Sequence, residues 1–228
     1  MQIKFLGTGG AFDANLINSA AILSIKEKRY LLDCGHSVFP ILVKKGVADK
    51  IDAVVITHLH DDHVGSLSTF AFYCHHVLGK KLTVLVPLHD VFEAKLRQLF
   101  SITIGKYEKY VDIKPLEPAI QGIETTNFHT TGMESFSYLF KDEEEYIAYS
   151  GDLGDPDLLF NYLQENEYDP QHCTVFHDTS FIRSSAHAYY KDLMKWQQAF
   201  VLYAYHCDPS KAPSDNTLPL VYNSSFLF

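Results

Sequence analysis

The stretch VVITHLHDDHVGSL, residues 54–67, places three histidines and two aspartates within six consecutive positions. A run of apolar, β-branched residues precedes this cluster, and such a run predicts a buried strand. An imidazole or carboxylate that is buried without a partner costs free energy. The crowding of these side chains where a strand ends therefore indicates a functional site and not a core.

The spacing within the cluster predicts metal ligands. His58 and His60 are two residues apart, which in extended backbone directs both rings to one side. Asp62 and His63 follow, where the chain is expected to enter a helix. Imidazole and carboxylate groups together suit zinc, manganese or iron. Four ligands so arranged favour two adjacent metal sites, and solvated polar residues at a helix start are the alternative.

Two metal sites need further ligands, and these are expected at other strand ends. Three residues each follow an apolar, β-rich run: His129, Asp152 and His206. A single histidine in such a position is usually a rim residue with a satisfied hydrogen bond. Three ligand-type residues in the same context are instead candidates to complete the cluster.

Length and composition describe an ordinary globular protein. The chain has 228 residues, 46% hydrophobic and 21% charged, which suits one sizeable domain over residues 1–228. The net charge of −9 disfavours a surface that wraps long nucleic acid, but it leaves a small anionic ligand open.

The cysteines and the apolar runs bear on location. The four cysteines are scattered and form no C-x-x-C pair, which fits reduced thiols in a cytosol. The start MQIKFLGTGG reads as a strand and a turn and not as a signal peptide, and no apolar run approaches a membrane span. A cytoplasmic protein without membrane contact is the expectation.

Strand patterns recur along the whole chain, with helical patterns between some of them. The predicted strands are residues 3–6, 20–25, 30–32, 51–57, 82–86, 123–128, 136–140, 146–149, 174–176 and 201–205. The predicted helices are residues 64–78, 90–100, 156–166 and 187–198. The pattern restarts near Ile120. An αββα sandwich of two similar halves, in the α/β (α+β) class, explains this order better than one parallel sheet.

The cluster and the later histidines resemble a known superfamily. HLHDDH matches the H-x-H-x-D-H signature of the metallo-β-lactamase superfamily, and the likeness runs from LGTGGAF through LLDCGHS to His206. The resemblance implies the metallo-β-lactamase αββα sandwich. It also implies that one metal is held by His58, His60 and His129, the other by Asp62, His63 and His206, with Asp152 bridging the two.

A second segment resembles the ribonuclease Z-like branch of that superfamily. TVFHDTSF, residues 174–181, is similar to the H-E-A-T segment of the branch, with Asp178 in place of its glutamate. His187, within SSAHAYY, resembles the branch's non-ligand histidine that assists proton transfer. The resemblance thus implies His187, Asp178 and the metal ligand Asp62 as catalytic residues.

Two departures from ribonuclease Z point to a smaller substrate. Ribonuclease Z carries a long tRNA-gripping arm between its third histidine and the bridging aspartate, whereas 22 residues separate His129 from Asp152 here (152 − 129 − 1). The segment HCDPSKA after the last ligand also lacks the expected Arg-Tyr pair. A compact phosphodiester, such as a cyclic or short nucleotide, is therefore the expected substrate, and tRNA is not.

The leading hypothesis is a binuclear metal-dependent phosphodiesterase that uses a metal-bridging hydroxide, with zinc expected and manganese or iron as alternatives. His187 would protonate the leaving group while Asp178 fixes its ring. One alternative is a hydrolase of esters, lactones, thioesters or β-lactams on the same fold. Another is a module that binds a nucleotide through metals without turnover. Homodimers are common among relatives, so a homodimer stays open.

Overall fold

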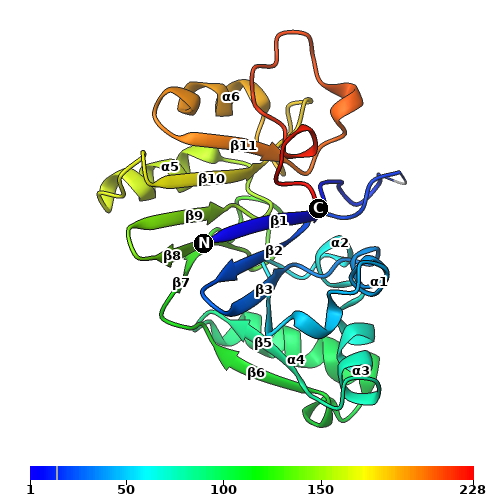
Figure 1. Ribbon diagram of the computed structural model, residues 1–228. Coiled ribbons are helices and arrows are strands. Elements are labelled where there is room, and N and C mark those ends of the chain that lie inside the picture. Colours follow the sequence, from blue (N-terminus) through cyan, green and yellow to red (C-terminus); the bar gives the residue numbers. More distant parts are fainter. Residues whose placement is uncertain (14) are drawn as a thin grey trace.

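The computed structural model describes residues 1–13 and 15–228, and its strands form two sheets (Figure 1). The first has the order β1-β2-β3-β4-β5-β6, with β1 (Gln2–Gly7), β2 (Ala20–Ile25), β3 (Lys28–Leu32), β4 (Ala53–Val55), β5 (Leu82–Val86) and β6 (Val111–Pro115). The second has the order β11-β10-β9-β8-β7, with β7 (Ile120–Glu124), β8 (Phe136–Asp142), β9 (Glu145–Tyr149), β10 (Cys173–Asp178) and β11 (Val201–Tyr205).

Both sheets are built in the same way. The strands β1, β2 and β3 pair antiparallel, and β3 to β6 then pair parallel. In the second sheet, β7, β8 and β9 pair antiparallel, and β9 to β11 pair parallel. The second sheet begins at Ile120, where the sequence pattern restarts, so the prediction of two similar halves is confirmed.

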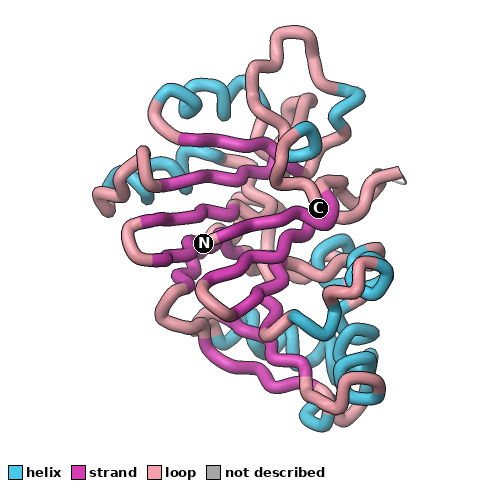
Figure 2. The backbone as a smooth tube through the Cα atoms, viewed as in Figure 1, coloured by secondary structure: helices cyan, strands magenta, loops and turns pink. Residues whose placement is uncertain are grey.

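Helices cover the outer faces of both sheets (Figure 2). On the first half lie α1 (Val38–Lys44), α2 (Asp61–Val64), α3 (Leu67–His76) and α4 (Asp90–Ile104), and on the second lie α5 (Pro156–Glu165) and α6 (Tyr190–Met194). Short 3-10 helices occur at Ala48–Lys50, Tyr107–Lys109, Lys195–Gln198, Pro209–Lys211 and Val221–Asn223. The layers are helix, sheet, sheet and helix, which confirms the predicted αββα sandwich.

Alternating side chains along β8 hold the second sheet between two layers. Phe136, Tyr138 and Phe140 point into the core shared with the first sheet, whereas Leu139 packs in a second core with α5 and α6. This is the two-residue period that a strand buried on both faces requires.

Phe5 of β1 joins the two sheets through ring contacts. It is fully buried, and its ring centroid lies between 5.2 and 6.1 Å from three rings of the second sheet: Tyr149, Phe176 and Tyr205. Each aromatic pair adds about 0.5–1.5 kcal/mol beyond the burial of its area. The two halves are therefore packed directly behind the strand ends that carry the predicted ligands.

Two predicted strands are too long, and the reason is local hydrogen bonding. The predicted strand at residues 51–57 shortens to β4 because the amide of Thr57 donates to the Asp33 side chain (2.8 Å) instead of a neighbouring strand. The predicted strand at residues 123–128 ends at Glu124, since Thr125 begins a turn in which Asn127 takes a left-handed φ of 70°. His129 thus lies in a loop and not directly after a strand.

Two predicted helices also differ from the structure. The predicted helix at residues 64–78 is divided into α2 and α3 by Gly65 and Ser66. The predicted helix at residues 187–198 starts only at Tyr190, because the backbone groups of Ala188 and Tyr190 pair with Ser180. The sequence patterns did not predict α1 or β6; β6 lies at a sheet edge and becomes exposed along its length.

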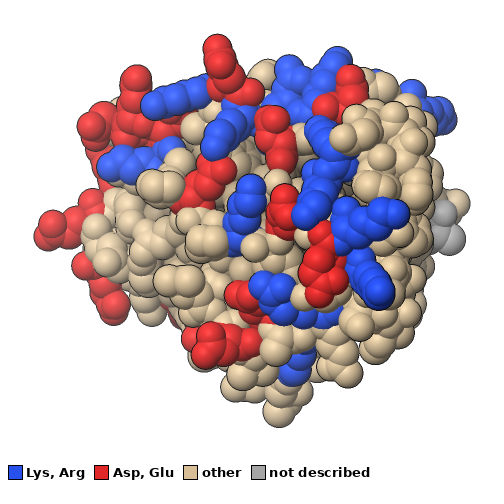
Figure 3. Space-filling model, turned by 90° about the horizontal axis from the view of Figure 1, so that it is seen from below, with Lys and Arg blue, Asp and Glu red and all other residues tan. Residues whose placement is uncertain are grey.

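The surface carries side chains of both charges. On the face shown in Figure 3, acidic and basic side chains are interspersed. Several lysines and arginines pair with acids, such as Lys81 with Asp112 and Lys95 with Glu134.

All four cysteines are buried and free. Across residues 1–13 and 15–228, no helix combines the length and the apolar character needed to cross a membrane.

Candidate metal centre

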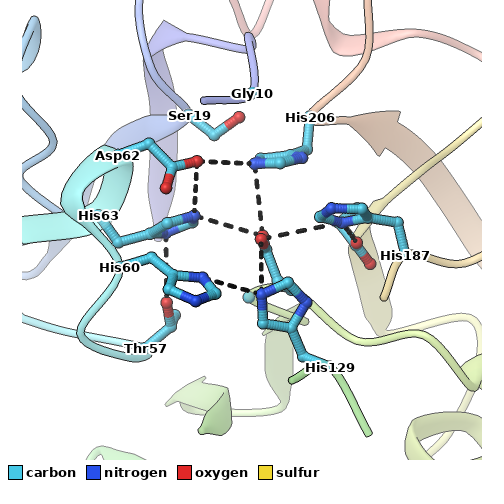
Figure 4. Close-up of polar contacts among 12 residues, drawn as sticks. Gly10, Ser19, Thr57, His60, Asp62, His63, His129, His187 and His206 are labelled. Carbon is cyan, nitrogen blue, oxygen red and sulfur yellow. Dashed lines mark hydrogen bonds and ion pairs between the residues drawn. The ribbon is translucent and has the colours of Figure 1, made fainter. Parts of the chain in front are cut away.

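The predicted ligand residues meet in one cavity of about 950 Å³ (Figure 4). They come from the turn after β4, from the loop between β7 and β8, and from the ends of β9 and β11. The cavity wall exposes six of the residues predicted from the sequence: His60, Asp62, His129, Asp152, His187 and His206. Three others, His58, His63 and Asp178, are completely buried behind that wall.

Three histidine nitrogens converge on one side of the site. Nδ1 of His60 lies 3.0 Å from Nε2 of His58 and 3.0 Å from Nε2 of His129. Because Zn–N bonds measure about 2.0–2.1 Å, two nitrogens on the same ion lie roughly 3–3.5 Å apart. The ligand atoms of these three residues could therefore hold one ion.

A second group of ligand atoms lies next to the first. Oδ2 of Asp62 is 3.5 Å from Nε2 of His63 and 3.4 Å from Nε2 of His206. Together with Asp152, these residues offer four ligand atoms within 4.8 Å of one another. A further group that could hold an ion shares Asp152 and His206 with this one, and adds Asp178 and His187.

Asp152 lies between the two groups with one oxygen toward each. Oδ1 is 3.4 Å from Nε2 of His63 and 3.5 Å from Nε2 of His206. Oδ2 is 3.9 Å from Nε2 of His58 and 3.7 Å from Nε2 of His129. A carboxylate in this position has the arrangement of a bridging ligand.

Two buried atoms of the site have no hydrogen-bond partner, namely Nε2 of His63 and Oδ1 of Asp152. Buried polar atoms are almost always paired, since an unpaired one costs about 1–3 kcal/mol. Both atoms face the second group of ligands. A cation among them would satisfy both, so the residues fit a metal ion at this place.

Hydrogen bonds on the outer ring nitrogens leave the inner ones free. Nδ1 of His129 donates to the carbonyl of Ala186 at 2.7 Å, and Nδ1 of His63 lies 2.9 Å from Oδ2 of Asp33. Nδ1 of His58 lies 3.1 Å from Oγ1 of Thr57. Such partners hold a histidine in the tautomer whose other nitrogen can bind a metal.

Asp33 and Thr57 contact the candidate ligands from outside, which the sequence patterns did not predict. Asp33 is fully buried and accepts hydrogen bonds from the amide and the hydroxyl of Thr57, besides its contact with His63. Its position was already visible in LLDCGHS, where a charged residue directly follows a buried strand.

The backbone is shaped to bring these side chains inward. Asp33 and His206 both have a φ of 62°, in the left-handed region that costs a non-glycine residue roughly 1–2 kcal/mol. Gly35 lets the carbonyl of Asp62 approach so closely that an added Cβ would lie 1.9 Å from that oxygen. The amide of Cys34 donates to the carbonyl of His63 at 2.7 Å, which ties the two turns together.

Burial and charge set the protonation states of the ligands. Burial lowers the pKa of His58 well below its usual value, so its ring is neutral and its nitrogen is available. Burial alone would raise the pKa of Asp152, but the neighbouring His206 and His63 outweigh it and hold this pKa well below the usual range. Burial would also lower the pKa of His63, but the charges of Asp152 and Asp33 outweigh it and raise this pKa well above its usual value, so a cation that binds His63 must displace a proton.

The pair of His187 and Asp178 lies beside the ligands. Nδ1 of His187 is 2.8 Å from Oδ2 of Asp178 and 3.8 Å from Oδ2 of Asp152. Burial lowers the pKa of His187, but the hydrogen bond and the charge of Asp178 outweigh it and raise the pKa to about 9. Asp178 is itself held by the amide of Leu153, 3.2 Å from Oδ1, so the structure brings this predicted pair together at the cavity.

The fold and the ligand pattern define a protein of the metallo-β-lactamase fold. The model of the family described as Anti-Pycsar protein Apyc1 matches residues 1–220, and the chain belongs to that family.

Relatives and solved structures agree with this assignment. An Anti-Pycsar protein Apyc1 of Bacillus phage BSP38 is 29% identical over 223 residues, which cover 86% of this chain and 83% of that protein. The metallo-β-lactamase fold protein YhfI from Bacillus subtilis superposes with a TM-score of 0.69 at 18% identity, covering 90% of this chain and 85% of YhfI. For the short form of human tRNase Z, the TM-score is 0.63 at 18% identity, and 90% of this chain and 92% of that chain are covered. Family, fold and ligand clusters together support a metal-dependent hydrolase.

Replacing Asp33 by asparagine tests how the buried carboxylate holds the site. Asp33→Asn keeps the size of the side chain but removes the charge that fixes His63. Loss of such an outer partner typically costs 10–100-fold in metal affinity, and we expect zinc affinity to fall about that much. Competition with a chromophoric chelator measures it. Asp52→Asn is the matched control, because Asp52 is an exposed aspartate whose side chain accepts a hydrogen bond from the backbone amide of Arg29, away from the cavity. Equal zinc affinity in both variants would contradict this role.

Proposed function

We propose that the protein is a binuclear metal-dependent phosphodiesterase that acts on a small or cyclic nucleotide. The observation that carries this proposal is the position of Asp152, with one carboxylate oxygen toward each ligand group and with His187 3.8 Å away. Membership of the Anti-Pycsar protein Apyc1 family and the metallo-β-lactamase fold support the hydrolase part of the proposal.

The proposed ligands come from both halves of the chain. His58, His60 and His129 would hold one divalent ion, and Asp62, His63 and His206 the other, with Asp152 between them. Zinc is the first candidate, and manganese or iron also suit these donors. Because neither half supplies a full set, we propose that residues 1–228 work as one domain.

Two divalent cations at these residues would polarise the phosphodiester and lower the pKa of a bound water. The protein's own groups would act around them. Asp62 and Asp152 would supply negative charge to the cations, and His58 and His60 would supply neutral nitrogens from one turn.

His187 is the proposed general acid. Its Nδ1 is engaged by Asp178, which leaves Nε2 to deliver a proton to the departing alkoxide oxygen. The raised pKa of about 9 is consistent with a ring that carries this proton at neutral pH. Nδ1 of His177, 3.1 Å from the other oxygen of Asp178, helps to keep that carboxylate in place.

The short connection from His129 to Asp152 supports a compact substrate. It consists mainly of the hairpin of β8 and β9, so it offers no long arm to grip a folded RNA. The net charge of −9 agrees with that preference. The cytoplasmic location and a homodimer stay predictions from the sequence.

Hydrolysis of bis-para-nitrophenyl phosphate tests the proposed chemistry. After loading with zinc or manganese, the wild-type protein should release nitrophenolate, and Asp152→Ala should lose both this activity and bound metal, because both groups share this carboxylate. Metal content is measured on the same samples by atomic emission. No turnover by folded, metal-loaded wild-type protein would contradict the proposal and favour an ester or lactone substrate.

His187→Ala separates an enzyme from a protein that only binds its ligand. General acids typically raise the rate about 10²–10⁴-fold, so kcat for hydrolysis of a cyclic nucleotide should fall by about that factor. The affinity of the variant for the same nucleotide should change little. His172→Ala is the control, since His172 is exposed and pairs with Glu145 away from the cavity. An unchanged kcat in His187→Ala would remove His187 from the mechanism.

A further inference from the structure

The cavity is larger than a phosphodiester group needs, and its outer part differs in character from the metal centre. At about 950 Å³, it has the size of a pocket for a whole nucleotide. The inner part carries the histidines and aspartates described above. The outer part is lined by apolar side chains from separate segments, among them Phe12, Phe181 and Ile182.

Phe12 is the most exposed large apolar side chain of the described residues, with 100% exposure. Single apolar residues on a surface need no special account. Phe12, however, lines the same cavity as the metal ligands. Ile182, from the loop after β10, is 78% exposed and lines that cavity as well. An unburied aromatic face therefore lies at the mouth of a polar reaction site.

The turn that carries Phe12 is anchored to the metal centre. The amide of Gly10 donates to Oδ2 of Asp13 at 2.8 Å, and the amide of Asp13 donates to the carbonyl of Gly10 at 3.3 Å. Gly10 lies against the ring of His206, where an added Cβ would be 3.1 Å from Cε1 (Figure 4). Phe12 is thus two residues from a direct contact with a ligand histidine.

The charge of the lining fits a nucleotide placed across both parts. Lys211 is the one lysine or arginine among the described residues that line the cavity. Its Nζ lies 3.3 Å from Oδ2 of Asp208. The outer part therefore offers little charge to bind a second phosphate. It offers an aromatic face and an aliphatic side chain, which suit the flat, weakly polar face of a base.

We propose that Phe12 and Ile182 form a nucleobase subsite at the mouth of the cavity, in which the base stacks on Phe12 while its phosphodiester reaches the metal centre. This inference rests on the proposed function and names the part of the substrate that the outer cavity selects. Stacking of a base on an aromatic side chain is typically worth about 1–3 kcal/mol.

The test compares 3′,5′-cyclic AMP with the same cyclic phosphate bearing a methoxy group in place of the base. Phe12→Ala should raise KM for cyclic AMP about 5- to 100-fold with kcat nearly unchanged, because stacking stabilises bound substrate and not the transition state alone. KM for the base-free substrate should stay within about twofold of wild type. Phe12→Trp should keep wild-type values, and Phe72→Ala, which removes an exposed ring of α3 outside the cavity, should affect neither substrate.

Equal effects of Phe12→Ala on both substrates, or no effect on either, would overturn the subsite. Failure of the proposed function gives a different result, since wild-type protein would then turn over neither substrate. In that case, equilibrium dialysis of metal-loaded protein with cyclic AMP decides the question. Weaker binding by Phe12→Ala than by Phe72→Ala supports the subsite, and equal binding or none overturns it.

Discussion

Asp152 is a buried, ionised carboxylate, only 3% exposed, whose two oxygens face different groups of histidines. A charge in this position is costly unless opposite charge surrounds it. The positive charge of His63, whose pKa is raised, offsets part of that cost, yet Oδ1 of Asp152 and Nε2 of His63 still lack hydrogen-bond partners. Divalent cations would resolve this imbalance. The architecture around Asp152 can be understood as the means of holding it between two sets of ligands.

Each of those two sets draws its ligands from both halves of the two-sheet fold. The first sheet provides the turn after β4, and the second provides the loop after β7 and the ends of β9, β10 and β11. Phe5 packs the two halves against each other behind these strand ends. Asp33 bonds the hydroxyl of Thr57 and contacts the outer nitrogen of the buried His63. The left-handed backbone of Asp33 and His206 is local strain that the surrounding packing sustains.

The sequence predicted which residues come together in the cavity better than it predicted some elements around them. Ligand chemistry depends on residue types and spacings, so HLHDDH predicted the cluster, strand-end positions predicted His129, Asp152 and His206, and the resemblance implied how they divide between two metals. The residues at which β4 and β7 end could not be predicted from the sequence pattern, because these ends depend on the side chain of Asp33 and on the turn at Asn127. The roles of Asp33 and Phe12 were also hidden, since both follow from three-dimensional neighbours: a buried histidine for one and an open cavity for the other.

We propose that two cations share Asp152. The most direct measurement is a crystal structure of the zinc-loaded protein with anomalous diffraction recorded on both sides of the zinc edge. We predict two anomalous peaks per chain, one among His58, His60 and His129 and one among Asp62, His63 and His206, with an Asp152 oxygen next to each. A single peak, or peaks away from Asp152, would contradict a binuclear centre.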